Sequence, residues 1–501
     1  MSQQVRVRFA PSPTGPLHIG GVRTALFNYL FAKKNNGVFF LRVEDTDQNR
    51  FVPGAEEYIM EALEWLGISP DETIGKNEKF GPYRQSERKD LYQQYANQLI
   101  NSGNAYYAFD TAEALDAARK KDEEQGKTFI YNHTNREKLD TSLVISAEET
   151  AKRIAKGEHY VIRFKTPINE TLHLHDIIRG DVKFETSLLD DKVLFKSDGM
   201  PTYHLANIVD DHLMKTTHVI RGEEWLPSMP LHVLLYRSFG WEAPQFAHLP
   251  LIMKPVGNGK LSKRDGDKMG FPVFPLDWKT EEGISSGYRE KGFFPEAVIN
   301  FLALLGWNDG TEKELYTLEE LVNSFDLNRV HKAGAKFDPE KNKWFNHQYL
   351  IKQKDTDLAK AYAPILAEKQ ITVTEDKLTR IVSLIKERAH FVSEFWEMSD
   401  FFFVAPTAYD EKATKNWKVE TPALMQELIS VLEEITDFTS HNIETVVKDW
   451  MTSNEIGMGK VMQPFRLSLV GALKGPHLFD IVEIIGKEET INRIQKAIAT
   501  L

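Results

Sequence analysis

The fold is decided by the opening stretch VRVRFAPSPTGPLHIGG (residues 5–21), which leads into a helical run and then into a second strand-like stretch, VFFLRV (residues 38–43). The first five residues alternate apolar side chains with Arg6 and Arg8, and this period of two predicts a β-strand. Three prolines and a glycine within residues 10–16 cannot continue a regular element, so a loop is expected to follow the strand.

The segment after this loop, residues 22–34, has apolar residues at helical spacing, and Asn36-Gly37 supplies the left-handed stop that often ends a helix. The nearly continuous apolar run at residues 38–43 is typical of a buried parallel strand. Strand, loop, helix and strand in this order predict the opening of a doubly wound α/β domain, whose ligands bind at the carboxyl ends of the strands. The acidic stretch EDTD at residues 44–47 follows the second strand at that edge.

The chain is longer than one domain, because 501 residues exceed the roughly 100–200 residues of a typical domain. A Lys- and Glu-rich helical stretch followed by a β-like one predicts an insertion, residues 91–189, between two halves of the α/β domain, residues 1–90 and 190–325. Residues 326–501 are dominated by amphipathic helices. The predicted fold class is therefore α/β: a Rossmann-type, doubly wound parallel sheet with an α/β insertion, followed by an all-α C-terminal region.

Composition excludes several classes of function. The chain has no cysteine, which rules out disulfides, a thiol nucleophile, iron–sulfur clusters and thiolate zinc sites, and leads us to expect a reducing, cytoplasmic setting. The 62 Lys and Arg residues against 73 Asp and Glu give a net charge of −11, which argues against a generally cationic nucleic-acid coat protein but permits a local basic surface. The N-terminus lacks the apolar run of a signal peptide, and no apolar stretch of about 18 residues predicts a membrane span, so a soluble protein is expected.

Two loops carry residues suited to phosphate chemistry. The loop of residues 11–21 precedes a helix, whose free N–H groups and positive dipole end favour an anion, and His18 can donate a hydrogen bond to a phosphoryl oxygen. The stretch KLSKR at residues 260–264 follows VGNG and places three cations in five residues, which could stabilise charge on a transferring phosphoryl or nucleotidyl group. Taken singly, the first loop could equally be a Pro-rich turn with an incidental histidine, and the second is more often a solvated basic loop.

Together these loops resemble the two signature motifs of class I aminoacyl-tRNA synthetases, here written HIGG (residues 18–21) and KLSKR. The resemblance to bacterial glutamyl-tRNA synthetases is carried further by flanking motifs that are spread over the first 225 residues. These motifs are RFAPSPTG (8–15), RVEDTD (42–47), GPYRQSER (81–88), SDGMPTYHLA (197–206) and VIRGEEW (219–225). The first signature ends in Gly21 instead of histidine, a variation that this family often shows.

The resemblance implies an enzyme that joins L-glutamate to ATP, giving glutamyl adenylate and pyrophosphate, and then transfers glutamate to the 3′-terminal adenosine of tRNA(Glu). Both steps depend on positioning and charge stabilisation, so the absence of cysteine is no handicap. Mg²⁺ is expected to neutralise the leaving pyrophosphate. The resemblance further implies that tRNA helps to order the site, that the insertion binds the tRNA acceptor end, that the helical region binds the anticodon, and that the protein is a cytoplasmic monomer.

The resemblance also assigns individual residues. The catalytic residues are His18, Lys260 and Lys263. The ATP-binding residues are Ser12, Thr14, His18, Gly20, Glu224, Trp225 and Lys263. The glutamate-binding residues are Arg8, Ser12, Glu44, Tyr203, Asn207 and Arg221.

Physical chemistry fits these glutamate contacts, although each residue also has an ordinary structural role. Arg8 and Arg221 can each grip a carboxylate bidentately, and Glu44 can accept from the ammonium. Tyr203 and Asn207, four residues apart, share a face if their segment is helical. Arg8 is assigned to the side-chain carboxylate, with the reverse assignment open, and an ordinary ion pair is the alternative for either arginine.

For other residues near the predicted site, an ordinary structural role is the alternative to a role in binding. Glu224 and Trp225 could be a helix-start carboxylate and a buried aromatic. Asp45 and Asp47 could order a ribose or a cation, or simply cap the next element, and they are not assigned a role.

One departure from the family concerns zinc. Many bacterial relatives carry a cysteine-containing zinc site in the insertion, but the matching stretches here read AYYAFD (105–110) and YNHTNRE (131–137). The expected ligand positions hold Ala108, Asp110, Asn135 and Glu137, with His133 nearby. Since zinc prefers nitrogen and sulfur ligands in a defined geometry, no structural zinc and no resident metal are predicted.

In the helical region, Arg388 and Arg466 are the predicted anticodon contacts, because single-stranded loop bases are read by stacking and by hydrogen bonds from arginine. A solvated or snorkelling side chain is the alternative for each.

Three functional hypotheses remain: a glutamate–tRNA ligase, a small nucleotidyltransferase with similar ATP-handling motifs, and a non-catalytic tRNA-binding paralogue. The nucleotidyltransferase has no use for a helical C-terminal module, and intact signature and arginine residues argue against the paralogue. Within the first class, a glutaminyl enzyme is expected to have a β-barrel-like C-terminal part, and charging of tRNA(Gln) as well as tRNA(Glu) stays open.

Overall fold

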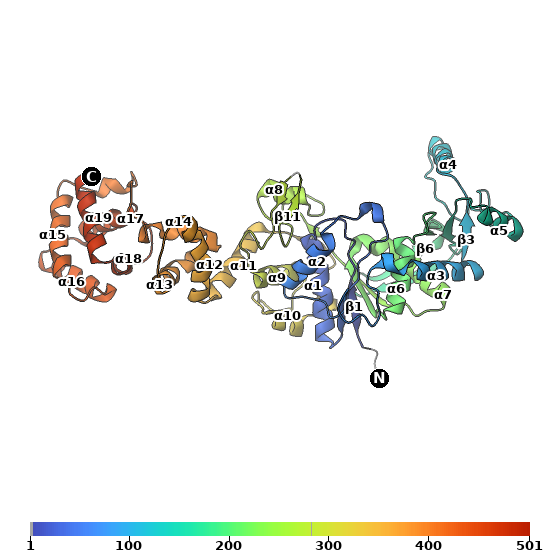
Figure 1. Cartoon of the computed structure of the whole chain (residues 1–501), viewed down its shortest axis with the longest axis horizontal. Helices are drawn as coiled ribbons and strands as arrows, with labels where there is room; N and C mark the ends of the chain where they lie inside the picture. Colours follow the sequence, from blue (N-terminus) through green and yellow to red (C-terminus); the bar gives the residue numbers. More distant parts are fainter. Residues whose placement is uncertain (1–3, 282) are drawn as a thin grey trace. The chain divides into compact units, whose positions relative to one another are not determined.

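The computed structural model describes residues 4–281 and 283–501. These fold into two compact units, one ending at Asn342 and the other covering Lys343–Leu501 (Figure 1). No helix among the described residues is long and apolar enough to cross a membrane.

The predicted strand–loop–helix–strand unit is confirmed. Strand β1 (Arg6–Phe9) pairs in parallel with β2 (Val38–Leu41), and α1 (Ile19–Lys34) connects them. The helix ends as expected, because Asn36 adopts a left-handed conformation with φ 49°. Since α1 begins at Ile19, the loop before it delivers His18 and the first helical N–H groups to the carboxyl end of the strands.

The second half of the catalytic sheet lies beside β1. Strands β8 (His218–Gly222) and β9 (Gln245–Leu249) run parallel, and the backbone of Arg6 in β1 is hydrogen bonded to Thr217 at the start of β8. Helices α6 (Tyr203–Leu213) and α7 (Met229–Phe239), with the short helix η4 (Glu223–Ser228), flank this half, and α2 (Ala55–Trp65) follows the first half. The carboxyl ends of β1, β2 and β8 thus converge on one region of the unit.

The inserted region forms an antiparallel sheet of β3 (Ala105–Ala108), β4 (Val161–Phe164) and β7 (Val193–Phe195). Its helices are α3 (Lys89–Asn101), α4 (Ala112–Glu124) and α5 (Ala147–Ala155). The expected boundaries of residues 91–189 differ from this sheet in two ways. Strands β5 (Thr171–Asp176) and β6 (Gly180–Glu185), inside the expected insertion, join β9 of the catalytic sheet, whereas β7, outside it, completes the inserted sheet.

The end of the first unit also lies later than the expected boundary at residue 325. Residues 326–342 stay with the first unit because β13 (Ala335–Lys336) pairs with β10 (Ile252–Met253), and Val330 forms a β-bridge with Trp307. The other elements of this part are α8 (Lys263–Met269), β11 (Trp278–Thr280), β12 (Gly283–Ser285), α9 (Pro295–Leu304) and α10 (Leu318–Ser324).

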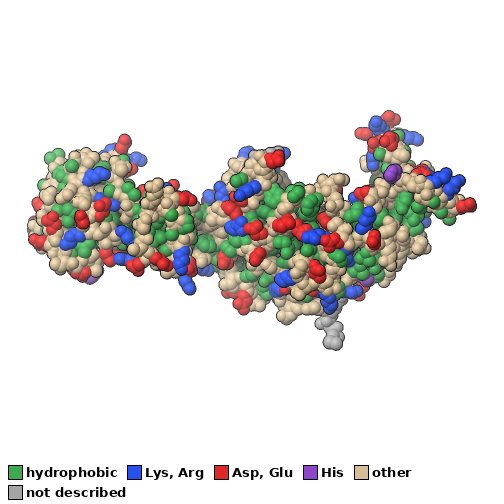
Figure 2. Space-filling model, viewed as in Figure 1, with side chains coloured by type: hydrophobic (Ala, Val, Ile, Leu, Met, Phe, Trp, Pro, Cys, Tyr) green, Lys and Arg blue, Asp and Glu red, His purple; other side chains and the backbone are tan. Residues whose placement is uncertain are grey.

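The second unit is helical, as predicted. After α11 (Pro339–Lys352), which spans the boundary, it contains α12 (Asp355–Glu368), α13 (Glu375–Ile385), α14 (Phe395–Ser399), α15 (Thr421–Glu434), α16 (Ser440–Ser453), α17 (Met458–Val470), α18 (Leu478–Ile485) and α19 (Lys487–Thr500). Helix α19 packs against α15 and α17 (Figure 1). Basic and acidic side chains are interspersed over the visible face of each unit (Figure 2).

Candidate active site

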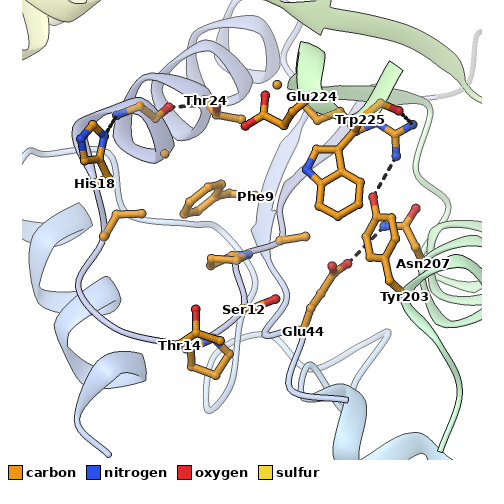
Figure 3. Close-up of a pocket in the computed structure, with 18 of the residues that line it drawn as sticks. Phe9, Ser12, Thr14, His18, Thr24, Glu44, Tyr203, Asn207, Glu224 and Trp225 are labelled. Carbon is orange, nitrogen blue, oxygen red and sulfur yellow. Dashed lines mark hydrogen bonds between the residues drawn. The ribbon is translucent and has the colours of Figure 1, made fainter. Parts of the chain in front are cut away.

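A cavity of about 680 Å³ opens where the catalytic strands end, bordered by the β1–α1 loop, the end of β2, the start of α6, and η4. This volume lies within the usual range for small-molecule sites. Twelve of the thirteen predicted catalytic and substrate residues line it: Arg8, Ser12, Thr14, His18, Gly20, Glu44, Tyr203, Asn207, Arg221, Glu224, Trp225 and Lys260. Figure 3 shows ten residues of the lining labelled, with Glu44 and Trp225 on opposite sides of the open space.

His18 stands at the N-terminus of α1 and has a defined tautomer. Its Nδ1 accepts a hydrogen bond from the Gly20 backbone N–H at 3.1 Å, so the proton of the neutral ring resides on Nε2. Burial, followed by the charge of Lys260, lowers the pKa of His18 to about 4, which keeps the ring neutral near pH 7. The Nε2 atom is buried and has no hydrogen-bond partner in the described part of the chain. Because an unpaired buried donor is unfavourable, this atom is suited to an acceptor that arrives with a substrate.

Glu224 and Lys260 form an ion pair in the lining of the cavity. The Nζ of Lys260 lies 2.7 Å from Glu224 Oε1. Burial opposes ionisation of Glu224, but the hydrogen bond and charge of Lys260 outweigh it and lower the pKa of the carboxyl. A Cβ at Gly222 would meet the Glu224 carboxylate, so a larger residue there would displace that carboxylate from its present position.

Lys263 is the one predicted substrate residue that does not line the cavity. It is exposed and forms the first residue of α8, whose N-terminus is capped by Ser262 and Asp265. A tight turn precedes α8, in which the Lys254 N–H donates to the Gly259 carbonyl at 3.0 Å, and Gly257 and Gly259 have φ angles of 78° and 115°. In this conformation the turn presents Lys260, and not Lys263, to the cavity.

Arg8 is held in the cavity wall by a carboxylate. Its Nε and Nη2 donate to the two oxygens of Asp211 at 3.0 and 3.2 Å, and both side chains are buried. Arg42 shares Asp211 through Nη1 at 2.9 Å and donates from Nη2 to Glu44 at 2.8 Å. Among the described residues, no group accepts a hydrogen bond from Nη1 of Arg8, which leaves that nitrogen for a ligand.

Arg42 and Asp211 were missed by sequence reasoning. Arg42 lies inside an apolar run, and a charged residue there was the available signal, because a fully buried arginine needs carboxylate partners. Asp211 carried no signal, since its partners Arg8 and Arg42 come from strands that are remote in sequence.

Glu44, Asn207 and Tyr203 complete the wall beside Arg8. Asn207 donates to Glu44 Oε1 at 3.1 Å, and burial raises the pKa of Glu44, against the effect of Arg42. Tyr203 and Asn207 lie in the first turns of α6, so the predicted helical spacing is confirmed. Figure 3 marks the contact between Asn207 and Glu44 and a separate one that reaches the Tyr203 hydroxyl.

Arg221, at the end of β8, forms the remaining wall. Its Nη1 donates to the Tyr203 hydroxyl at 2.9 Å and its Nη2 to the Trp225 carbonyl at 3.3 Å. It forms no ion pair with any described carboxylate. In the cavity, Arg8, Arg221 and Glu44 therefore lie in the same lining as a helix N-terminus with a neutral histidine, which suits an amino dicarboxylic acid beside a phosphate group.

At two of the expected zinc-ligand positions, Asp110 and Asn135 form ordinary hydrogen bonds with the protein. Asp110 accepts from the Tyr131 hydroxyl at 2.7 Å and from the Asp140 backbone N–H at 3.0 Å, and Asn135 bonds to the backbone of Ile130. Within residues 4–281 and 283–501, no group of three or more His, Asp or Glu side chains could hold a metal ion. The absence of zinc stays a prediction.

The two predicted anticodon residues meet in the second unit. Arg388, in the short helix η6 (Lys386–Arg388), donates to the carbonyl of Gly475 at 3.0 Å. Arg466, on α17, donates to the carbonyls of Lys474 and Pro476 at 3.0 and 2.8 Å. Burial and the nearby charge of Arg388 lower the pKa of Arg466. The loop of residues 474–476 thus accepts hydrogen bonds from both arginines, and neither arginine pairs with a described carboxylate.

The catalytic-domain model of class I tRNA synthetases (E and Q) matches residues 4–344, and an anticodon binding domain model matches residues 356–498. The chain therefore belongs to the class I tRNA synthetase (E and Q) family. The match of residues 356–498 to an anticodon binding domain argues against a small nucleotidyltransferase, since such an enzyme has no use for that domain.

Relatives of this chain include glutamate–tRNA ligases. It is 85% identical over 501 residues to the glutamate–tRNA ligase of Flavobacterium johnsoniae and 79% identical to that of Flavobacterium psychrophilum, and both matches cover 100% of each chain. Among solved structures, it is similar to a glutamate tRNA ligase from Elizabethkingia meningosepticum in complex with its amino acid. That similarity has 55% identity, a TM-score of 0.97 and coverage of 100% of both chains.

Proposed function

We infer that the chain acts as a glutamate–tRNA ligase that first activates L-glutamate with ATP and then charges tRNA(Glu). The observation that carries this inference is the single cavity in which arginines, Glu44 and the N-terminus of α1 converge, in a chain that aligns with glutamate–tRNA ligases over its whole length. We further propose that it works as a monomer in the cytoplasm, as its family resemblance implies.

In the first step, a carboxylate oxygen of glutamate attacks the α-phosphorus of ATP. A new bond forms between that oxygen and phosphorus, the bond to the bridging oxygen breaks, and pyrophosphate leaves with the electron pair. In the second step, a ribose hydroxyl of the terminal adenosine attacks the carbonyl of the adenylate, the hydroxyl proton is lost, and AMP leaves. Neither step needs a covalent nucleophile from the protein.

We assign the residues of the cavity to the two substrates as follows. Arg8 and Arg221 bind the glutamate carboxylates, while Glu44 accepts from the ammonium, supported by Ser12, Tyr203 and Asn207. Ser12, Thr14, Gly20, Glu224 and Trp225 contact ATP, and His18 donates from Nε2 to a phosphoryl oxygen. Lys260 leaves Glu224 when ATP enters, because each then has a new partner: a phosphate for Lys260 and the nucleoside for Glu224.

The Mg²⁺ that accompanies ATP would neutralise charge on the leaving pyrophosphate. Asp47 lines the cavity and would supply one of the one or two protein carboxylates that Mg²⁺ usually takes.

A second cavity, of about 520 Å³, gives the 3′ end of the tRNA a path to the first. The two cavities share Thr202 and Tyr203. The second is lined by Phe129, Tyr131 and several cationic side chains, and the guanidinium of Arg163 lies 3.7 Å from the centre of the Tyr131 ring. Aromatic faces combined with cations suit single-stranded nucleotides. This supports the expectation that the inserted region binds the acceptor end.

Replacing Lys263 with alanine is expected to slow adenylate formation by roughly 100-fold, because a donor that stabilises charge in the transition state contributes about that much. Lys263 must first move from its exposed position at the start of α8 toward the phosphates. Pre-steady-state adenylate formation measures the rate, and a binding assay should show unchanged tRNA affinity. Lys268→Ala, on the same helix, is the control. If both variants formed the adenylate at the same rate, Lys263 would not act in adenylate formation.

Replacing both Arg388 and Arg466 with alanine is expected to weaken tRNA binding by about 10- to 100-fold, since one base-reading arginine contributes roughly that much. Fluorescence anisotropy with labelled tRNA(Glu) measures the affinity. The control is Arg380→Ala, an exposed arginine of α13 that pairs with Glu483. The loss of affinity caused by the double substitution should be smaller for a tRNA with an altered anticodon than for tRNA(Glu). An equal loss of affinity for these two tRNAs would contradict anticodon reading.

The proposed function is tested by ATP–pyrophosphate exchange with glutamate or glutamine, with and without tRNA. Exchange is expected with glutamate, not with glutamine, and is expected to be stimulated by tRNA. Absence of exchange under every condition would instead support the non-catalytic paralogue.

A further inference from the structure

Arg221 is a buried cation whose direct partners are all uncharged. Its side chain is only 5% exposed, yet its four hydrogen bonds go to the Tyr203 hydroxyl, the Trp225 carbonyl and two imidazole rings. The imidazoles are His248, whose Nε2 lies 3.0 Å from Arg221 Nε, and His232, whose Nδ1 lies 3.3 Å from Nη1. A buried charge is normally stabilised by an opposite charge, so the location of the nearest anion needs explanation.

The guanidinium determines the tautomers of both histidines. Because arginine can only donate, His248 must accept on Nε2 and carry its proton on Nδ1. That proton points to Asp176, whose Oδ2 lies 2.6 Å from Nδ1. By the same argument His232 accepts on Nδ1 and donates from Nε2 to Nδ1 of His204 at 3.2 Å.

Asp176 is a fixed and ionised anchor. It is fully buried at the end of β5, beside β9, which carries His248. Backbone N–H groups of Ile178, Arg179 and His248 donate to its oxygens at 2.8 to 3.3 Å. Burial opposes ionisation of Asp176, but these bonds and the one from His248 lower the pKa of the carboxyl. Burial also lowers the pKa of His248, which keeps its Nε2 an acceptor.

The two arginines that are predicted to bind carboxylates, Arg8 and Arg221, therefore have different surroundings. Arg8 is paired directly with Asp211, which occupies two of its nitrogens. Arg221 has no such direct pair: the carboxylate of Asp176 lies on the far side of the His248 ring, so the guanidinium remains available to an incoming carboxylate.

We propose that His248, anchored by Asp176, is a positioning residue that aims Arg221 at a glutamate carboxylate and holds the protein's own anion one ring away from it. This inference rests on the proposed role of Arg221 as a glutamate contact. His248 itself does not line the cavity and acts through Arg221.

Two substitutions at His248 separate its two hydrogen bonds. In His248→Asn the short amide can still donate to Asp176 but cannot reach Arg221, whereas in His248→Gln the longer amide can accept from Arg221. The KM for glutamate is expected to rise by about 10- to 100-fold in His248→Asn, the usual effect of losing a hydrogen bond to a charged group. The KM for ATP and kcat at saturating glutamate should change less than about twofold, and His248→Gln should restore most of the affinity for glutamate.

His218→Asn is the matched control, because His218 lies on the same strand as Arg221 and is not hydrogen bonded to it; its ring packs against Phe31 at an interplanar angle of 60°. Should His248→Asn fail to fold, as judged by thermal unfolding, Asp176→Asn provides the second test and is expected to raise the KM for glutamate by a smaller factor.

An unchanged KM for glutamate in His248→Asn would overturn the inference, as would equal losses in KM for glutamate, KM for ATP and kcat that His248→Gln does not relieve. A wild-type protein without glutamate-dependent exchange would instead overturn the proposed function. The two failures are therefore distinguishable.

Discussion

Replacing Arg221 with methionine is expected to lower kcat/KM for glutamate by about 1000-fold, the largest effect of any substitution proposed for this protein. Removing one partner of a buried charge pair destabilises the complex by roughly 2–5 kcal/mol, because the other charge is left buried and unpaired. Arg221 has no described carboxylate as direct partner, and under the proposed assignment the bound glutamate supplies one. Methionine keeps the length and apolar packing of the stem, which limits the effect to the lost charge and hydrogen bonds.

Exchange kinetics at varied glutamate measure this loss, and the KM for ATP serves as an internal reference. The control is Arg237→Met on α7, an arginine that is half exposed and paired with Glu170 at the surface. Surface pairs contribute roughly 0–1 kcal/mol, so this variant should behave like the wild type. A KM for glutamate within threefold of the wild type in Arg221→Met would show that Arg221 does not bind the substrate.

Replacing His18 with asparagine is expected to slow adenylate formation by roughly 100- to 1000-fold while leaving stability almost unchanged. Asparagine is a good N-cap and can accept from the Gly20 N–H as His18 Nδ1 does, so α1 stays capped. It cannot reach the position of Nε2, the buried donor without a partner, and losing one such preorganised donor has an effect of this size.

His18→Ala separates the two roles of this residue. Alanine removes both the cap and the donor, so it should be as slow as asparagine and in addition less stable by about 0.5–2 kcal/mol. Rapid-quench measurement of adenylate and chemical denaturation give the two quantities. If His18→Asn retained the wild-type rate, Nε2 would have no role in the transfer and His18 would be a structural cap.

Local sequence patterns predicted the opening of the fold, and the family resemblance predicted twelve of the residues that line the cavity. The alternation in β1, the Pro-rich loop and the left-handed Asn36 are properties of neighbouring residues, and the structure contains all three. The structure brings these twelve residues into one cavity because they lie in the loops after strands or near the starts of helices, which the fold gathers at one edge.

Long-range pairing explains what the sequence left undetermined. Asp211 meets Arg8 across 203 residues, and His248 meets Asp176 across 72, so no local pattern marks either pair. The domain boundaries shifted for the same reason: β5 pairs with β9 and β13 with β10, and such register is decided by packing between segments and not by composition. The position of Lys263 outside the cavity depends on the conformation of the turn before α8, which the motif does not specify.

The net charge of −11 restricts the part of the surface that can attract RNA. Acidic and basic side chains are interspersed over the visible surface (Figure 2), and we propose that RNA contact comes from local basic groups such as Arg388 and Arg466. A body that repels RNA elsewhere suits an enzyme that has to select one tRNA.

Transfer of labelled L-glutamate to purified tRNA(Glu) in the presence of ATP and Mg²⁺ tests the central claim most directly. The account predicts an alkali-labile glutamyl ester on the tRNA(Glu) 3′ end, and a parallel reaction with tRNA(Gln) decides whether that tRNA is charged as well. No ester on tRNA(Glu), or an ester formed with glutamine in place of glutamate, would contradict it.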